Sequence, residues 1–341
     1  MQVFDDHRSS IIDELIFLAE LTASHRMSSL HPDSMPARDV TKLIDFIKLQ
    51  GHILEKVPGF SSTLGFSHQR IQALAPAITF QDSSLSVQLP VTESLLLPGR
   101  KEVSLGTYAA LIDDVTTWAI FLDNPKAAKP GVSVSLRADR SGPSVKPGDE
   151  ITITGRVDKT GRNMGFLSAD IHNSRTGDLL CRSSHVKYLA SLGFVTDQAL
   201  TSYGWKIAEM YANQLPDVSG QGAKTMEDLF GPIQFLDDRR AVLDTLTPHY
   251  ASPGGPIHGG AQAVLIEIAG AHAAEKVSSS LQLRSIHVEY LSSPRAPVEM
   301  VVDCHPQQDP SVLEVTVSLN GGGRCLSRGF LQFSKVGQSK L

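Results

Sequence analysis

The chain of 341 residues is poor in cysteine, in long apolar runs and in clusters of basic residues. Its three cysteines, Cys181, Cys304 and Cys325, are too few and too scattered for a disulfide framework or a zinc site. The longest apolar stretches stop well short of the ~20 residues needed to span a bilayer. No Lys/Arg-rich block occurs and the net charge is -5, which argues against a nucleic acid partner.

The N-terminal segment is rich in acids at Asp5, Asp6, Asp13, Glu14 and Glu20. This pattern argues against a secretory signal and against an Arg-rich, acid-poor transit peptide. Together with the sparse cysteines, it predicts a cytoplasmic protein, with a mitochondrial location left open. The length suits two domains of roughly 100–200 residues each.

The hydrophobic pattern of the first half of the chain changes near Ser84. Apolar residues at helical spacing predict a helical N-terminal extension over residues 1–80. From there the pattern predicts a first domain over 81–190, in which turn residues separate strands on either side of one nearly all-apolar helix. The helix is expected over 105–121, and the strands over 84–91, 132–137, 151–157, 166–172 and 179–189.

The same order of elements returns after a connecting segment expected over 191–232. A second domain is predicted over 233–341, with a largely apolar helix over 259–276 and strands over 283–291, 298–304, 313–319 and 325–333. The two helix starts align, since Ser104 to Asp113 and His258 to Glu267 each end in an acid nine residues on. A duplicated domain is the economical explanation.

Each predicted helix is apolar on nearly every side and must therefore be buried on all sides. An antiparallel sheet wrapped round one long central helix buries it in this way, and this architecture is the hotdog fold. The sequence therefore predicts an α+β protein with two tandem hotdog domains and a helical N-terminal extension.

The acids Asp113 and Glu267 are the candidate catalytic carboxylates. A carboxylate in apolar surroundings is costly unless it is paired or hydrogen-bonded, and desolvation raises its pKa, which suits a general base. The alternative is a structural carboxylate held by a buried hydroxyl or an arginine. The same repeat position of both acids favours a catalytic role.

The glycines at the second helix start, Gly259 and Gly260, lie where unpaired backbone N–H groups carry partial positive charge. Such groups can polarise a carbonyl and hold an oxyanion. The alternative is that these glycines only start a tightly packed helix. His258, just before them, is expected to cap or shape the turn more than to act as an acid or base.

The spacing along each helix requires every site to combine residues from both helices. Gly260 and Glu267 are seven residues apart, or about 10 Å along a helix axis. One helix therefore cannot bring its own acid to its own N-terminus. Two domains packed side by side with antiparallel helices would form two composite sites.

Three stretches resemble the PaaI-like hotdog acyl-CoA thioesterases, a family that also includes 4-hydroxybenzoyl-CoA thioesterases and mammalian relatives. They are Gly255 to Ala261 (Gly-Pro-Ile-His-Gly-Gly-Ala), Pro130 to Val134 and His185 to Lys187. The resemblance covers roughly residues 84–190 and 236–336. It implies hydrolysis of an acyl-CoA to a free acid and CoA, with no metal or redox cofactor, and association of two such chains into a homo-oligomer.

The resemblance also implies the composition of one composite site. Its acid would be Asp113, its carbonyl donors Gly259 and Gly260, its loop polar group Ser252 and its water-positioning strand residue Ser133.

The other composite site would pair Leu105 and Gly106 with Glu267. Two departures make it the expected inactive site. Ser104-Leu105 replaces the family's His-Gly, and Leu283 stands where a second strand serine is expected.

Three alternatives stay open at this point. A hotdog hydratase or dehydratase would want a histidine and the acid in one compact motif, which the chain lacks. A non-catalytic acyl-CoA sensor or assembly subunit fits degenerate repeats. Within a thioesterase, the acid could act as nucleophile or as general base on water.

Overall fold

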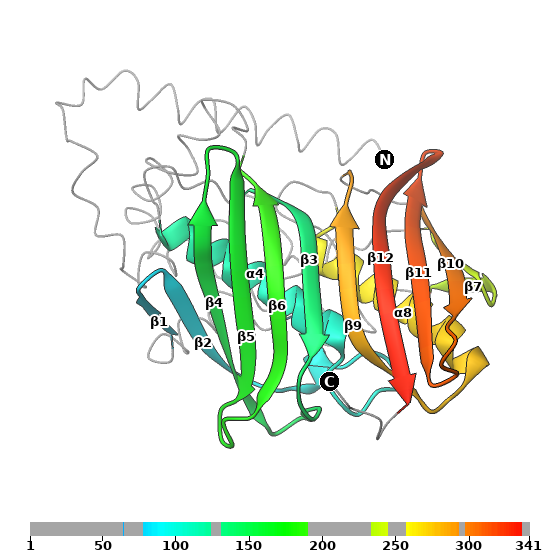
Figure 1. The fold of residues 1–341 in the computed structure, drawn as a ribbon, viewed down its shortest axis with the longest axis horizontal. Helices are drawn as coiled ribbons and strands as arrows, with labels where there is room; N and C mark the ends of the chain where they lie inside the picture. The colour runs from blue at the N-terminus through cyan, green and yellow to red at the C-terminus, as the bar shows by residue number, and fades with distance from the viewer. Residues whose placement is uncertain are drawn as a thin grey trace, which may run out of the picture.

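The computed structural model describes residues 64, 78–123, 131–189, 233–244, 257–292 and 297–335. Within these ranges, twelve strands form one sheet in the order β1-β2-β4-β5-β6-β3-β9-β12-β11-β10-β8-β7. Two helices of 19 residues each, α4 (Leu105–Asp123) and α8 (Gly259–Val277), lie next to each other on one face of this sheet (Figure 1).

The helix α4 packs against β2, β3, β4, β5 and β6, which with β1 are the six strands that come first in the sheet order. All neighbouring strands in this set are antiparallel. Their bounds are β1 Ile78–Gln81, β2 Ser84–Pro90, β3 Val132–Arg140, β4 Glu150–Thr160, β5 Met164–Asn173 and β6 Leu179–Tyr188.

The helix α8 packs against strands of the other set, whose neighbours are again antiparallel. Their bounds are β7 Gln234–Asp237, β8 Arg240–Leu243, β9 Leu281–Tyr290, β10 Val298–Pro306, β11 Val312–Gly321 and β12 Arg324–Lys335. The two sets join where β3 pairs with β9, from Ser135 opposite Glu289 to Asp139 opposite Ser285.

The nine strands and two helices expected from the sequence are confirmed, with ends moved by at most three residues. The sequence pattern missed β1, β7 and β8, which have only four residues each and are too short to show a period. The short 3-10 helix η4 (Glu93–Leu95) was also not expected.

One expected boundary was wrong. The strand β1 begins at Ile78, inside the helical extension predicted over residues 1–80. It pairs with β2 through a turn at Asp82 and Ser83, both at positive φ, so the chain joins the sheet before residue 81. The rest of that extension, apart from the buried Leu64, and the whole connecting segment expected over 191–232 lie outside the described residues.

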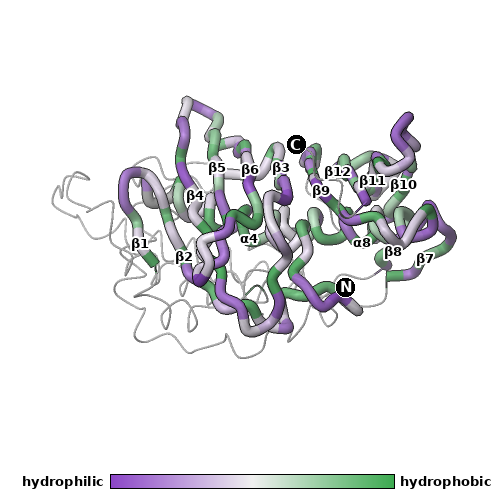
Figure 2. Tube along the Cα trace, turned by 60° about the horizontal axis from the view of Figure 1, so that its bottom comes forward, coloured by the Kyte–Doolittle hydropathy of each residue, from purple (hydrophilic) through white to green (hydrophobic). Residues whose placement is uncertain are grey.

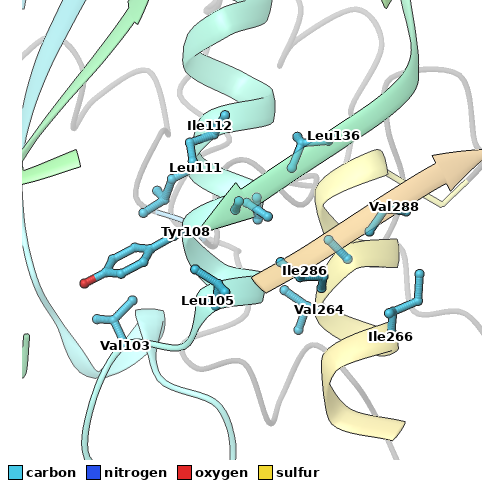
Figure 3. Packing of buried hydrophobic residues seen from close by; sticks show 14 of the residues in the cluster. Val103, Leu105, Tyr108, Leu111, Ile112, Leu136, Val264, Ile266, Ile286 and Val288 are labelled. Carbon is cyan, nitrogen blue, oxygen red and sulfur yellow. The ribbon is translucent and has the colours of Figure 1, made fainter. Parts of the chain in front are cut away.

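The core lies between the helices and the sheet. The side chains of Leu111, Ile112 and Val264 are fully buried, as are those of Leu136 on β3 and Ile286 on β9. Figure 3 shows these residues converging from α4, α8 and the two central strands. Burial of this kind removes apolar surface from water at roughly 25 cal/mol per Å² and fixes the helices against the sheet.

Hydropathy alternates along many of the strands, as Figure 2 shows. In β4, for example, Ile151 and Ile153 are buried, whereas Thr152 and Thr154 are partly exposed. This period of two residues is that of a sheet with one covered face. In the described part of the chain, no helix is long and apolar enough to cross a membrane.

Candidate active site

Each helix places its buried acid at the N-terminus of the other helix. The backbone N–H of Gly260 on α8 donates a hydrogen bond to Oδ2 of Asp113 on α4 at 3.1 Å. The backbone N–H of Gly106 on α4 donates to Oε2 of Glu267 on α8. The helices are therefore antiparallel, and each acid compensates unpaired N–H groups at a helix start.

Both close approaches are made at glycines. A Cβ at Gly259 would lie 2.7 Å from Oδ2 of Asp113, and a Cβ at Gly106 would lie 2.6 Å from Oε2 of Glu267. Any larger side chain at either position would push the facing carboxylate away.

Polar side chains from β3 and β6 surround the other oxygen of Asp113. The hydroxyl of Ser133 donates to Oδ1 at 2.8 Å. Nε2 of His185 lies 3.0 Å from Oγ of Ser133, and Nδ1 of the same ring lies 2.7 Å from Oγ1 of Thr116. The ammonium of Lys187 lies 3.6 Å from Oδ1 of Asp113, and the lysine side chain is 4% exposed, so this is a buried ion pair.

A bulge in β3 turns Ser133 toward the helices. The register between β3 and β6 shifts between Ser133 and Ser135, with Ser133 opposite Lys187. Leu136 is fully buried and, with strict alternation, Ser133 would point to the opposite face. The bulge places both side chains on the same face.

The charges of this cluster hold Asp113 in its ionised form. Burial by itself raises the pKa of Asp113, but Lys187, His258 and the hydrogen bond from Ser133 outweigh burial, so the pKa lies below its ordinary range. The sequence-based expectation of a raised pKa considered burial alone and was wrong for this residue. Burial, together with Lys187, lowers the pKa of His185 to about 3, which keeps this ring neutral.

His258 is the N-cap residue of α8, and its Nδ1 accepts a hydrogen bond from the N–H of Gly260 at 3.1 Å. This matches the capping role expected from the sequence. Its Nε2 lies 3.3 Å from Oδ1 of Asp114, the residue after Asp113. The hydroxyl of Tyr290 on β9 donates to the carbonyl of Gly259 at 3.1 Å and so reaches the same helix start.

The surroundings of Glu267 are different. Burial raises its pKa, and the hydrogen bond from Gly106 offsets only part of this effect. A bulge in the pairing of β9 with β12 places Leu283 opposite Phe333, both buried. The equivalent bulge in β3 places Ser133 opposite Lys187.

The structure thus brings together most of the residues singled out from the sequence. Asp113, Ser133, His258, Gly259 and Gly260 lie in one cluster, and Glu267 lies at Gly106 in the other. Ser252 lies outside the described residues.

Four side chains near Asp113 were not singled out as site residues, namely Asp114, Thr116, His185 and Lys187. His185 and Lys187 were quoted as part of the resemblance. The alternation of β6 would have placed both on the covered face with Ser183 and Cys181. A buried lysine requires an anionic partner, so the burial of Lys187 that this alternation predicts could have placed it in the site.

Comparison with known proteins identifies the family to which this chain is similar. The profile described as "Thioesterase superfamily" matches residues 103–179. Mouse acyl-coenzyme A thioesterase 13 is 31% identical over 140 residues, which are 41% of this chain and 91% of the mouse protein. The human protein of the same name is 36% identical over 86 residues, which are 25% of this chain and 59% of the human protein.

A solved structure extends the likeness to the second half of the chain. The 12:0-ACP thioesterase from Umbellularia californica covers 74% of this chain and 94% of its own length, with a TM-score of 0.51 and 10% identity. At this identity the likeness concerns the fold alone. From its sequence and its antiparallel sheet on long buried helices, the chain belongs to the thioesterase superfamily of the hotdog fold.

Proposed function

We propose that the chain is an acyl-CoA thioesterase with one active site, built around Asp113. The contact between Oδ2 of Asp113 and the N–H of Gly260 carries this proposal. It places an ionised carboxylate beside the donor that would polarise a thioester carbonyl. The name of the mouse and human relatives supports an acyl-CoA as the substrate class.

In the proposed reaction, the thioester carbonyl takes the helix N–H groups at Gly259 and Gly260 in place of the carboxylate. The C–S bond breaks, and the oxygen of water bonds to the carbonyl carbon. Of the two protons of this water, one goes to the carboxylic acid product and the other to the CoA thiolate. Asp113 acts either as the attacking nucleophile or as the base that orients this water. Both roles require the ionised carboxylate that Lys187 supports.

The neighbouring residues have separate roles in this proposal. Ser133 donates to Oδ1 of Asp113 and would hold the attacking water on the same side. His258 caps the helix that supplies the carbonyl donors. Ser252 remains the proposed polar group of the preceding loop.

We further propose that residues 81–190 and 233–341 are two tandem hotdog domains that arose by duplication, joined by a connecting segment over 191–232. The sheet order supports this, because the first set reads β2-β4-β5-β6-β3 and the second reads β8-β10-β11-β12-β9 from edge to centre. Both sets carry a bulge on the strand that follows the helix.

The duplication predicts one active and one inactive site. The Glu267 site keeps the acid and the facing N–H of Gly106. It has Leu283 and Phe333 where the Asp113 site has Ser133 and Lys187. In the described part of the chain, no cation is ion-paired with Glu267 as Lys187 is with Asp113.

The wider setting is also proposed. We infer a role in lipid metabolism, in the cytoplasm or the mitochondrion, and an assembly of two or more copies of this chain. No nucleic acid partner, metal or redox cofactor is needed for the reaction.

The decisive experiment measures release of free CoA from short, long and aromatic acyl-CoAs by wild type, Asp113→Asn and Glu267→Gln. We expect wild-type turnover, its loss in Asp113→Asn and its retention in Glu267→Gln. Loss only in Glu267→Gln would keep the thioesterase and reverse the site assignment. Binding of acyl-CoA by folded wild type without any release would instead support a non-catalytic acyl-CoA sensor.

A further inference from the structure

The imidazole of His258 lies between two successive carboxylates of α4. Its Nδ1 is 3.5 Å from Oδ2 of Asp113, and its Nε2 is 3.3 Å from Oδ1 of Asp114. The side chain of His258 is 13% exposed and that of Asp114 is 7% exposed.

The two acids restrict where the ring carries its protons. An ionised carboxylate only accepts hydrogen bonds, whereas a neutral imidazole has one donor and one acceptor nitrogen. Nδ1 accepts a hydrogen bond from the N–H of Gly260, so in the neutral ring the nitrogen that faces Asp114 is the donor, Nε2–H. The protonation of His258 is then decided at Nδ1, on the side of Gly260.

Nδ1 of His258 shares one donor with Asp113. The N–H of Gly260 lies 3.1 Å from Oδ2 of Asp113 and also 3.1 Å from Nδ1 of His258. A neutral ring accepts this hydrogen bond through its lone pair. A ring protonated at Nδ1 cannot accept it, and its new N–H faces the carboxylate of Asp113 instead.

The charged groups around the ring act in opposite directions. Burial by itself lowers the pKa of His258, but Asp114 and Asp113 outweigh burial and the opposing Lys187, so the pKa lies above its ordinary value. The other titratable groups near Asp113, His185 on β6 and Tyr290 on β9, are neutral, because burial lowers the pKa of the first and raises that of the second.

We propose that Asp114 is a positioning residue for the Asp113 site. By accepting a hydrogen bond from Nε2–H of His258, it fixes the tautomer and favours the cationic ring, which releases the Gly260 N–H for a substrate carbonyl. This inference rests on the proposed thioesterase function. Asp114 itself touches neither the substrate nor the reacting atoms.

The protonation state of His258 then controls whether the N–H of Gly260 is available to the substrate carbonyl. While His258 is neutral, its lone pair competes with the thioester carbonyl for the N–H of Gly260. When His258 is protonated, this competition ends, and the additional positive charge also stabilises an oxyanion at the helix start. Turnover should therefore fall as pH rises through the pKa of His258.

The first test is an NMR titration of the full chain with ¹⁵N-labelled histidine. The signal of His258, one of 12 histidines, is assigned by its loss in His258→Gln. We expect Nε2 to stay protonated throughout and Nδ1 to titrate. In Asp114→Asn, which keeps an acceptor oxygen and removes the charge, we expect the pKa of His258 to fall by about one pH unit or more.

The matched control is Asp303→Asn, which removes the same charge from an exposed position on β10. It should leave the titration of His258 unchanged. An unchanged pKa in Asp114→Asn would overturn the proposal. Should Asp114→Asn fail to fold, the wild-type spectrum still decides, because titration at Nε2 in place of Nδ1 would also overturn it.

The second test is the pH profile of turnover. We expect the alkaline limb of kcat in Asp114→Asn to move to lower pH by the same amount as the pKa of His258, with KM unchanged. An alkaline limb of kcat that stays in place while the pKa of His258 moves would overturn the proposal that protonation of His258 controls turnover. If His258 titrates as expected but the wild type shows no turnover, the coupling of Asp114 to His258 is supported. Only the thioesterase proposal is then refuted.

Discussion

Oδ2 of Asp113, halfway along α4, accepts a hydrogen bond of 3.1 Å from the N–H of Gly260 in the first turn of α8. The residues are 147 positions apart in the sequence. Glu267 and Gly106 make the same contact in the opposite direction. The two contacts have similar backbone geometry and different side-chain surroundings, which makes matched variants possible.

Adding a methyl group at one glycine or the other tests the two sites separately. Gly259→Ala places a Cβ against Oδ2 of Asp113, and Gly106→Ala places one against Oε2 of Glu267. Since a displacement of about 1 Å can cost about 100-fold in rate, we expect this loss of kcat/KM in Gly259→Ala. Gly106→Ala should stay close to wild type in the same CoA-release assay. Equal losses in both variants would mean that the Glu267 site contributes to turnover.

The buried lysine should support stability as well as the charge of Asp113. Lys187→Met leaves a buried carboxylate without its cation, and we expect a loss of about 3–5 kcal/mol in the free energy of unfolding. Urea denaturation measures this loss. The exposed Lys335→Met is the control and should change the free energy by less than about 0.5 kcal/mol. Adding Asp113→Asn to Lys187→Met should recover part of the loss, and a double variant no more stable than the single one would contradict the pairing.

The two acids should have opposite effects on the pH dependence of stability. The pKa of Asp113 is lowered in the folded chain, so its contribution is present above the unfolded value of about 4 and is lost as pH falls through the folded pKa. The pKa of Glu267 is raised, so its contribution is present below the unfolded value and is lost as pH rises through the folded pKa.

Urea denaturation of wild type and the two neutral variants between about pH 2 and pH 8 checks these signs. At pH 7, Asp113→Asn should be less stable than wild type, and the difference should shrink toward acid pH. Glu267→Gln should gain stability relative to wild type as pH rises. The same trend in both variants would refute the assigned charge states.

Tyr290 should affect the rate through the helix start. Tyr290→Phe removes the hydrogen bond of its hydroxyl to the carbonyl of Gly259. A hydrogen bond of about 0.5–1.5 kcal/mol corresponds to a decrease in kcat of about two- to tenfold, with KM little changed. Tyr188→Phe on the exposed face of β6 is the control and should keep the wild-type rate. A change in KM alone would place Tyr290 in substrate binding.

Much of the architecture could be predicted from local pattern. The apolar runs of α4 and α8 and the alternation in β4 and β5 are periodic over ten or more residues, and periodicity identifies such elements well. The start of β1 at Ile78 was misassigned, since four residues cannot show a period. The matching positions of Asp113 and Glu267 predicted that each helix needs the other.

The amino-acid sequence by itself determined the two buried helices, the strands around them and the pair of acids, because hydrophobic period and repeat spacing are local properties. Only the tertiary structure decided the charge state of Asp113. The pKa of this carboxyl depends on Lys187 and Ser133, which the bulged pairing of β3 with β6 brings close, and on His258, which the antiparallel packing of α8 supplies. These distances arise from strand register and helix packing, and electrostatic interactions of buried groups depend on such distances directly.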